Sequence, residues 1–271
     1  MQADLEPRVG ESPAPVRHRA PVVSNRRVAA DTWWLELESP EIARRVAWGQ
    51  FVMIGFGLEH LAPPFLPRPF SVGWRSPDGR IGLLVRRFGA GSAALAALRP
   101  GERALLLGPL GRPFRLEAAR RVVCVAGGVG LAPFLILAGE ARRQGLAVEL
   151  LYGELSAERV FDPVLIEQLT DAPPQIWTED GTLGRHGRVT DGLDASGPVT
   201  VLGCGPTAML RALAGRAARE GFELQVSVEE HMGCGVGTCQ GCVVRSADGR
   251  WLKACTEGPV FDASDLSWSP G

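Results

Sequence analysis

Lysine, long apolar runs and an excess of either charge are all scarce in this sequence. Lys253 is the single lysine among 29 lysines and arginines, a bias that we attribute to genome composition. The formal net charge of −1 gives no electrostatic reason to expect nucleic acid or an acidic membrane surface as a partner. No apolar run reaches the ~20 residues that span a bilayer, and the N-terminus lacks the basic and then apolar order of a secretory signal. We therefore expect a cytoplasmic protein with no membrane span and no nucleic-acid partner.

Histidine is also rare, and this limits the chemistry that the chain can perform. The sequence has four histidines, none of which forms a pattern with a nucleophile. We therefore predict no catalytic acid, base or nucleophile in this protein.

The length of 271 residues and the hydrophobic content of 45% allow two or three units with real cores. Residues 1–18 are rich in Pro, Arg, Glu and Ala without apolar periodicity, which predicts a disordered leader. Changes of pattern along the chain predict four parts. These are a leader at 1–19, a barrel at 20–117, a nucleotide-binding domain at 118–225 and a C-terminal arm at 226–271.

The clearest chemical pattern is a set of four cysteines near the C-terminus, Cys234, Cys239, Cys242 and Cys255. Four, two and twelve residues separate them, and the first two gaps match the plant-type spacing that holds a [2Fe–2S] cluster. A structural zinc site would normally use two short Cys-x-x-Cys pairs, and a disulfide would require an oxidising compartment. Neighbouring glycines allow sharp bends and a close approach of backbone amides to the cluster: Gly233, Gly235, Gly237 and Gly241. We interpret the four cysteines as ligands of iron.

The region from 20 to 115 contains short β-type runs that are broken by Gly and Pro. Their fairly regular spacing predicts a small antiparallel barrel with one short helix at 91–98. The runs lie at 27–37, 50–56, 70–74, 81–86 and 103–108.

One segment of this barrel, Arg68-Pro69-Phe70-Ser71, carries a candidate flavin motif. Arg68, fixed by the following proline, presents a permanent cation to phosphate, and Ser71 can reach a flavin ring. Gly91 and Ser92 open the short helix, where unpaired amides suit a pyrophosphate. The alternative for the segment 68–71 is an ordinary strand start, and the alternative for Gly91 and Ser92 is a plain helix cap.

A different pattern begins at the continuous apolar run 121–126, which is typical of a strand buried on both faces. A turn with Gly127, Gly128 and Gly130 follows, and then Pro133 and a helix at 134–144. Strand, glycine turn and helix outline a dinucleotide cradle, although the spacing departs from G-x-G-x-x-G at the third glycine. Further strands at 148–152, 175–178 and 199–202, with helices at 157–169 and 207–220, predict a parallel sheet.

The last of these strands runs into Cys204-Gly205-Pro206, at the same predicted edge of the sheet as the first glycine turn. Cys204 has two interpretations: a thiol packed in the interior, or a thiol that lies against a nicotinamide ring. Cys124, inside an apolar strand, is predicted to be a core residue. The preference for NAD or NADP stays open, since either Glu154 or Arg159 could face the ribose.

Taken in order, these motifs resemble the electron-transfer subunits of dihydroorotate dehydrogenase B, within the ferredoxin–NADP reductase superfamily. The resemblance covers about 21–263, and its most particular parts are 228–234 and 255–261. It implies an α+β multidomain fold: an N-terminal antiparallel Greek-key β-barrel for FAD, an α/β parallel-sheet domain for NAD(H), and a small C-terminal [2Fe–2S] arm. The FAD contacts that it implies are Arg68, Pro69, Phe70, Ser71, Leu84, Val85, Arg86, Gly91 and Ser92.

The resemblance also implies a partner, a separate dihydroorotate dehydrogenase catalytic subunit that carries FMN, in a heterotetramer with two copies of each subunit. Two positions depart from the family pattern: Pro67 stands where relatives have a basic residue, and Ser92 replaces a threonine. The implied function is electron transfer between NAD(H) and that partner in pyrimidine synthesis. A reductase that serves another terminal partner has the same domain order, and a regulatory module that binds zinc is a third hypothesis.

Overall fold

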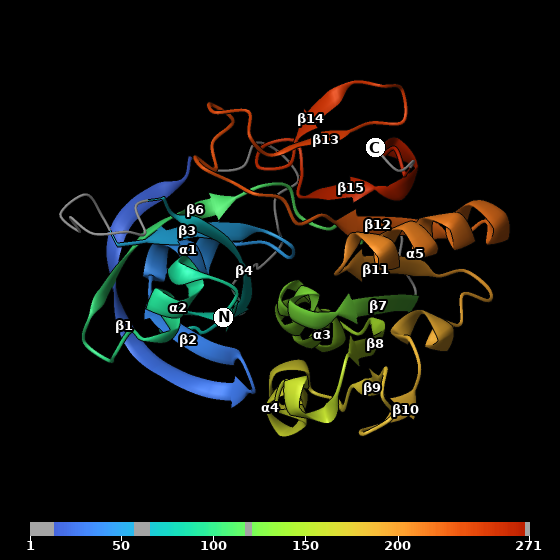
Figure 1. Cartoon of the computed structure of the whole chain (residues 1–271), viewed down its shortest axis with the longest axis horizontal. Helices are drawn as coiled ribbons and strands as arrows, with labels where there is room; N and C mark the ends of the chain where they lie inside the picture. The colour runs from blue at the N-terminus through green and yellow to red at the C-terminus, as the bar shows by residue number, and fades with distance from the viewer. Residues whose placement is uncertain (1–13, 57–65, 117–120, 269–271) are drawn as a thin grey trace.

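The computed structural model describes residues 14–56, 66–116 and 121–268. In Figure 1 a barrel lies on the left, a layered sheet on the right, and a small C-terminal arm above the junction of the two. The predicted leader lies mostly outside the described residues, but its end does not. The first strand begins at Val16, so the barrel starts before the predicted boundary at 20. Residues 16–21 pair with strand residues 103–108, which closes the barrel and explains why this polar stretch is ordered.

Six antiparallel strands form the barrel, in the order β1-β2-β5-β4-β3-β6. Neighbours that are distant in sequence, such as β2 with β5 and β3 with β6, give it Greek-key connections. The strands are β1 (Val16–Ala29), β2 (Thr32–Glu38), β3 (Phe51–Gly55), β4 (Arg68–Arg75), β5 (Arg80–Arg86) and β6 (Arg103–Leu110), with helices α1 (Pro40–Arg45) and α2 (Ala90–Ala96). The predicted barrel is confirmed, whereas α1 was not predicted.

A seven-stranded sheet forms the second unit, in the order β10-β9-β8-β7-β11-β12-β15. All neighbours are parallel except β12 and β15, which are antiparallel. The strands are β7 (Arg121–Gly127), β8 (Ala147–Glu154), β9 (Gln175–Thr178), β10 (Arg185–His186), β11 (Thr200–Cys204), β12 (Glu223–Ser227) and β15 (Val260–Asp262).

Three helices cover this sheet: α3 (Ala132–Arg143), α4 (Pro163–Thr170) and α5 (Thr207–Glu220). The predicted helix at 157–169 is corrected here. A short 3-10 turn spans Ala157–Arg159, and α4 begins only at Pro163 because the Asp162 side chain caps it by accepting hydrogen bonds from the amides of Val164 and Leu165. Within the described ranges, no helix has the length and apolar character needed to cross a membrane.

The predicted boundary between the nucleotide domain and the arm, at 225/226, falls inside β12. The chain leaves the sheet after β12, forms the cysteine loop and the hairpin of β13 (Val243–Arg245) and β14 (Trp251–Lys253), and then returns as β15 beside β12. The arm is therefore attached to the sheet by two strands rather than by one linker.

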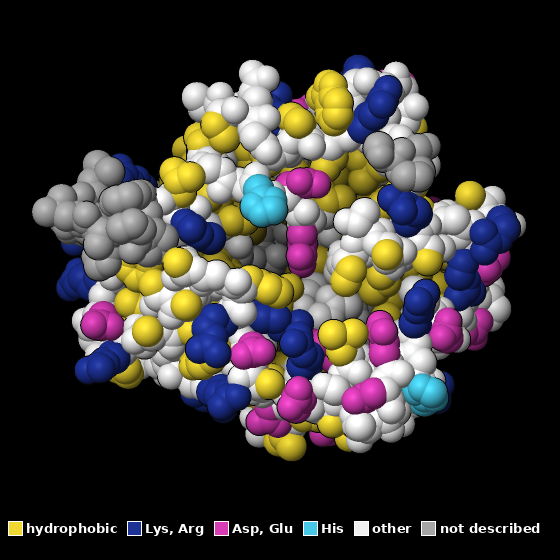
Figure 2. All heavy atoms as spheres, in the orientation of Figure 1, with side chains coloured by type: hydrophobic (Ala, Val, Ile, Leu, Met, Phe, Trp, Pro, Cys, Tyr) yellow, Lys and Arg dark blue, Asp and Glu magenta, His cyan; other side chains and the backbone are white. Residues whose placement is uncertain are grey.

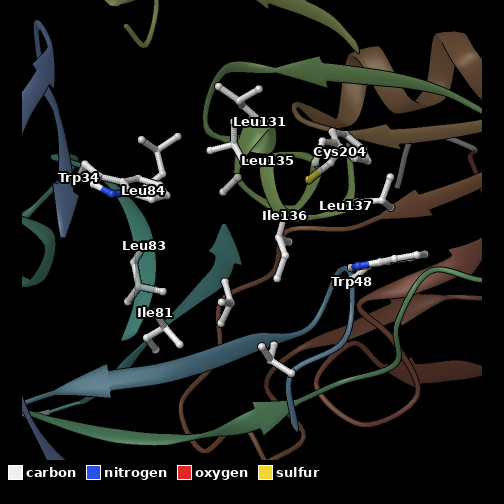
Figure 3. Close-up of a cluster of buried hydrophobic side chains, with 14 of the residues drawn as sticks. Trp34, Trp48, Ile81, Leu83, Leu84, Leu131, Leu135, Ile136, Leu137 and Cys204 are labelled. Carbon is white, nitrogen blue, oxygen red and sulfur yellow. The ribbon is translucent and has the colours of Figure 1, made fainter. Parts of the chain in front are cut away.

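The barrel and the sheet share a continuous apolar core. Trp34, Leu83 and Leu84 of the barrel belong to the same buried cluster as Leu135 and Ile136 of α3, as Figure 3 shows. Helix α3 is buried along most of its length because β7 and β8 contact it together with the barrel strand β4.

A polar clamp at the end of α3 reinforces this junction. Glu140 accepts two hydrogen bonds from Arg75, at 2.7 and 2.9 Å, and a third from the indole of Trp48 at 2.7 Å. Both charged side chains are 17% exposed, and the Arg–carboxylate fork is the strong, directional form of ion pair. The positions of the barrel and the sheet relative to each other are therefore fixed.

Candidate functional site

The four cysteines of the predicted cluster site lie in the loop between β12 and β13 and just after β14, and all four are free thiols. Cys242 and Cys255 are 1% exposed, Cys234 is half-buried and Cys239 is exposed. The loop bends at Gly235 and Gly237, whose φ angles of +74° and +80° favour glycine.

Backbone amides point at the sulfur of Cys234. The N–H groups of Val236 and Cys239 each donate to its Sγ at 3.4 Å. Burial alone would raise the pKa of the Cys234 thiol, but these donors and the neighbouring Cys239 side chain outweigh it and lower the pKa to about 7. A thiolate at this position is thus stabilised by the loop itself.

The remaining cysteines interact as a second pair. The pKa of the Cys255 thiol is raised to about 11 by burial and then by the adjacent Cys242 thiol. In the described part of the chain, no group of three or more His, Cys, Asp or Glu side chains has an arrangement suited to a single metal ion. Two pairs of soft sulfur donors, Cys234 with Cys239 and Cys242 with Cys255, match a two-iron cluster in which each iron takes two thiolates.

The cysteine loop rests directly on the barrel. Met53 of β3 and Leu110 of β6 form one buried cluster with Cys242 and Cys255. A Cβ atom at Gly235 would lie 2.5 Å from Cγ of Met53, so loop and strand are in close contact. The loop thus sits on the strand next to β4, where Phe51 of β3 pairs with Ser71.

The candidate flavin residues come together at one end of the barrel. Arg68 to Ser71 lie on β4, Leu84 to Arg86 lie on the neighbouring β5, and Gly91 and Ser92 lie in the first turn of α2. Nε of Arg68 would be 2.3 Å from a Cβ atom at Gly91, so the guanidinium occupies the space that a side chain would take. No carboxylate of the described residues pairs with Arg68, whose Nη1 donates to the carbonyl of Leu66. Among the described residues this cation thus has no carboxylate partner, and a cation against a bare first helical turn is suited to the phosphates of a flavin cofactor.

Other members of the flavin set have roles within the protein. Ser92 Oγ accepts hydrogen bonds from the amides of Phe88, at 2.8 Å, and Gly89, at 3.2 Å, and so caps α2 as the sequence alternative proposed. Leu84 and Val85 are buried in the core, at 4% and 0% exposure, and their contact with FAD stays a prediction.

Arg86 is buried at the junction of the two units. Its guanidinium forms an ion pair with Glu154 at the end of β8, and its Nε donates to Thr32 Oγ1 at 3.1 Å. Glu154 also accepts a hydrogen bond from the Tyr152 hydroxyl at 3.0 Å and is 6% exposed. Glu154 therefore forms its ion pair with Arg86. The two residues are far apart in the sequence, so no local pattern indicates this pair.

The two predicted glycine turns of the sheet are in contact at its C-terminal edge. A Cβ atom at Gly130 would be 2.2 Å from the carbonyl oxygen of Cys204, and one at Gly127 would be 2.8 Å from Cδ of Pro206. Gly128 has a φ of +59°, and a Cβ atom added there would lie 3.1 Å from Nη1 of Arg86. Pro133 occupies the first turn of α3 without breaking it. The turns form a bare backbone cradle of the kind that a dinucleotide needs.

Two further residues, Cys204 and Glu229, lie beside these turns. Cys204 is 1% exposed, and burial first and then Glu229 raise the pKa of its thiol. The packing interpretation of Cys204 thus agrees with the structure, and its contact with nicotinamide stays a prediction. Burial also raises the pKa of the Glu229 carboxyl, although the Arg86 charge opposes this. Glu229 was not predicted, because nothing in the sequence distinguishes it from other acids.

Figure 2 shows a hollow where the barrel, the sheet and the arm meet, with acidic side chains and a histidine on its rim. Between the sheet unit and the arm, a hollow of about 360 Å³ lies between the start of α5, Glu229 and the β13 strand. The barrel turn with Arg68 and Gly91, the glycine cradle and the cysteine loop thus belong to three adjoining elements.

Comparison with known proteins gives matches over nearly the whole chain. Residues 229–267 match the family model of the iron-sulfur cluster binding domain of dihydroorotate dehydrogenase B. The dihydroorotate dehydrogenase B (NAD(+)) electron transfer subunit of Geobacillus thermodenitrificans is 36% identical over 92% of this chain and 98% of that protein. The corresponding subunit of Desulforamulus reducens is 34% identical over 92% and 97% of the two chains.

Solved structures with the same architecture are also found. An NADH-dependent reduced ferredoxin-NADP oxidoreductase superposes with a TM-score of 0.81 and 25% identity, over 92% of this chain and 90% of that chain. A ferredoxin reductase of carbazole 1,9a-dioxygenase superposes with a TM-score of 0.65 and 22% identity, over 78% and 69%, which bears on the fold alone.

Proposed function

This chain belongs to the electron transfer subunits of dihydroorotate dehydrogenase B, and from that membership we propose that its three sites form one electron path. The protein is an oxidoreductase subunit that works with NAD(H), FAD and a [2Fe–2S] cluster. FAD, when bound, would exchange a hydride with NAD(H) and single electrons with the cluster, which joins a two-electron carrier to a one-electron carrier. The partner is a dihydroorotate dehydrogenase catalytic subunit with FMN, in an assembly with two copies of each chain.

One observation carries this proposal: the cysteine loop is seated on β3, directly beside the strand with the flavin motif. Gly235 of the loop touches Met53 of β3, and Met53 pairs with Pro69 of the flavin motif on β4. A flavin held at β4 would therefore lie next to the four thiolates that would hold the cluster, so that electrons would pass between the two cofactors across this contact. The exposed position of Cys239 supports a docking site for the partner subunit on this side of the cysteine loop.

Each element of the chain has a separate task along this path. The glycine cradle binds the dinucleotide, the buried pair Arg86–Glu154 holds that cradle against the barrel, and Arg68 binds the flavin phosphates. Cys234, Cys239, Cys242 and Cys255 ligate the iron. Hydride transfer depends on the stacking and distance of two rings rather than on a proton relay, which agrees with the absence of a predicted acid or base.

A second function has one observation in its favour. The superposition with the NADH-dependent reduced ferredoxin-NADP oxidoreductase shows that this architecture also serves other electron acceptors. In that case the same cofactors would be present, and only the terminal partner would differ. The predicted cytoplasmic location is unaffected by this choice and stays a prediction.

Purified protein tests the proposal directly. We expect flavin absorbance from FAD, about two irons per chain and bleaching of the flavin on addition of NADH. Co-purification with an FMN-containing dihydroorotate dehydrogenase, together with orotate formation from dihydroorotate and NAD(+), supports the first function. Rapid reduction of another acceptor without any such partner supports the second. Colourless protein with bound zinc would contradict both.

The contact of Arg68 with Gly91 gives a matched pair of variants for the flavin site. In Gly91→Ala the new methyl group must displace the guanidinium of Arg68, which is the flexible end of a side chain, so the fold should survive. We expect FAD affinity to fall by about 10- to 100-fold, the loss of a charge-assisted hydrogen bond. Gly89→Ala serves as the control, since its φ of −162° suits any residue and no atom lies within 4 Å. Titration of flavin-free protein with FAD measures both, and equal affinities for the two variants would remove Arg68 from the site.

A further inference from the structure

The hairpin of β13 and β14 joins two of the four cysteines of the cluster site. Cys242 directly precedes β13, and Cys255 follows the end of β14 by two residues. At the base of the hairpin, the amide of Ala254 donates to the carbonyl of Cys242 at 2.9 Å. The hairpin itself supplies no thiol, because all four cysteines lie outside its strands and turn. It is therefore a firmly attached extension of the cysteine site with no part in holding iron.

The tip of the hairpin is also held in place. The amide of Ala247 donates to the carbonyl of Asp265 at 2.8 Å, and the amide of Ser246 donates to the carbonyl of Arg250 at 2.8 Å. The hydroxyl of Ser246, which is buried, donates to the same carbonyl at 2.9 Å. A surface that this hairpin carries is thus preorganised, which lowers the entropic cost of binding a partner.

One face of the hairpin packs inward and the other faces outward. Val244 and Leu252 pack against the core of the sheet unit. Because side chains alternate along a strand, Arg245 and Trp251 lie on the opposite face, where they are cross-strand partners. Trp251 is 64% exposed, and no ion pair within the described ranges involves Arg245. An indole and a guanidinium thus stand side by side at the surface.

The outward face continues to the cysteine loop. Lys253 lies on the same face as Trp251, two residues further along β14, and a Cβ atom added at Gly237 would lie 3.8 Å from its Cδ. Val236, the neighbour of Gly237, is 43% exposed, and Cys239 is exposed as well. Figure 2 shows apolar side chains at the upper end of the arm, where Figure 1 places β13 and β14. We call this surface the hairpin face, made of Val236, Cys239, Arg245, Trp251 and Lys253.

Resting on the proposed function, we propose that the hairpin face selects the catalytic subunit, with Trp251 as the side chain that enters an apolar pocket of that subunit. Single electrons would pass between a cluster at the four cysteines and that subunit, so the partner must cover the side on which Cys239 is exposed. A standard interface covers ~800 Å² of each protein. Trp251 lies only ~7 Å along the strand from Lys253, which borders the cysteine loop. A partner seated over Cys239 therefore reaches Trp251 as well.

The chemistry of the two outward side chains defines what the partner must offer. Trp and Arg are enriched among the residues that dominate the binding energy of protein interfaces, where they are buried in well-packed pockets. The group that matches the guanidinium of Arg245 is a carboxylate. The catalytic subunit should therefore carry an apolar pocket with an acidic side chain at its rim.

The test measures binding of the purified catalytic subunit to the full-length protein that contains FAD and iron. We expect Trp251→Ala to weaken this binding by about 30-fold or more, which corresponds to the ~2 kcal/mol of a dominant interface residue. Iron content and the bleaching of flavin by NADH should stay the same, because the hairpin supplies no ligand. Trp251→Phe should restore part of the affinity, and Val164→Ala, at an exposed apolar residue of α4, should leave it unchanged.

Three outcomes would overturn the inference. Unchanged affinity in Trp251→Ala removes the indole from the interface. Loss of iron in the same variant shows that the hairpin supports the cysteine site instead. A dimer of the protein alone that Trp251→Ala dissociates, with unaffected binding of the catalytic subunit, assigns the hairpin face to a second copy of this chain. Failure of the unmodified protein to bind FAD, iron or the catalytic subunit would instead contradict the proposed function, so the two failures are distinguishable.

Discussion

Replacement of Cys239 by serine is expected to abolish electron transfer to the partner while NADH still reduces the flavin. Cys239 is the exposed member of the four cysteines. A Cβ atom added at Gly233 or at Gly241 would lie 3.7 Å from its Sγ, so both glycines are close to this sulfur. Serine keeps the size of the side chain but is a poor ligand for iron. The cluster should be lost without loss of the fold.

The expected size of this effect follows from the position of the cluster at the end of the path. Outer-shell changes cost metal sites about 10- to 100-fold, and removal of a ligand should exceed that range. Iron content should fall well below the ~2 per chain of the unmodified protein. Flavin bleaching by NADH, measured by stopped flow, should keep its rate because the nucleotide cradle and Arg68 are on other elements.

Cys124→Ala is the matched control for this variant. Cys124 is fully buried in β7, and burial raises the pKa of its thiol far above the usual range, so it is no ligand. This control should keep its iron and its transfer to the partner. A parallel loss of flavin reduction in Cys239→Ser would show that the cysteine loop supports the barrel rather than an electron exit.

Gly130→Ala should give the largest loss of nucleotide binding together with a loss of stability. The new Cβ would lie 2.2 Å from the carbonyl oxygen and 2.4 Å from the carbonyl carbon of Cys204, and these backbone atoms of β11 cannot turn away. The two glycine turns must then separate. We expect a cost of about 3 kcal/mol, at the upper end for overpacking, and a fall in Tm on the order of 10 °C.

The affinity of Gly130→Ala for NADH should fall by about 10-fold or more, which corresponds to a loss of at least ~1.4 kcal/mol of binding free energy. Gly215→Ala is the control in the same domain: it lies inside α5, where the nearest atom to the new methyl group is the flexible end of Arg219 at 3.5 Å. That change should raise stability by about 0.5–1 kcal/mol. Unaltered Tm and NADH affinity in Gly130→Ala would show that the turns do not need to touch.

Motifs that are local in the chain were the predictable part of this protein. The cysteine spacing and the strand, turn and helix around Gly127 depend on neighbours in sequence, so composition and periodicity indicate them. The helix at 207–220 was predicted to its ends because an apolar stripe and Gly221, at φ of +81°, define it locally.

Features made by distant segments were not predictable in this way. Glu154 was one of two residues, with Arg159, that could face the ribose, and only the meeting of β5 with β8 shows that Glu154 pairs with Arg86. The return of β15 to the sheet and the place of Glu229 beside Cys204 depend on the path of the arm. The early start of β1 was missed because Val16 and Ala20 are too few apolar residues to reveal a strand without its partner β6.

The seat of the cysteine loop on β3 also sets the order in which the protein is made. Met53 leaves the ribosome well before Gly235 and Cys255, which pack against it. The cradle for iron does not exist until the arm has folded back on a barrel that is already formed. We therefore expect the cluster to be inserted only after the arm has folded onto the barrel, and cells short of iron to accumulate folded protein that contains flavin but lacks the cluster.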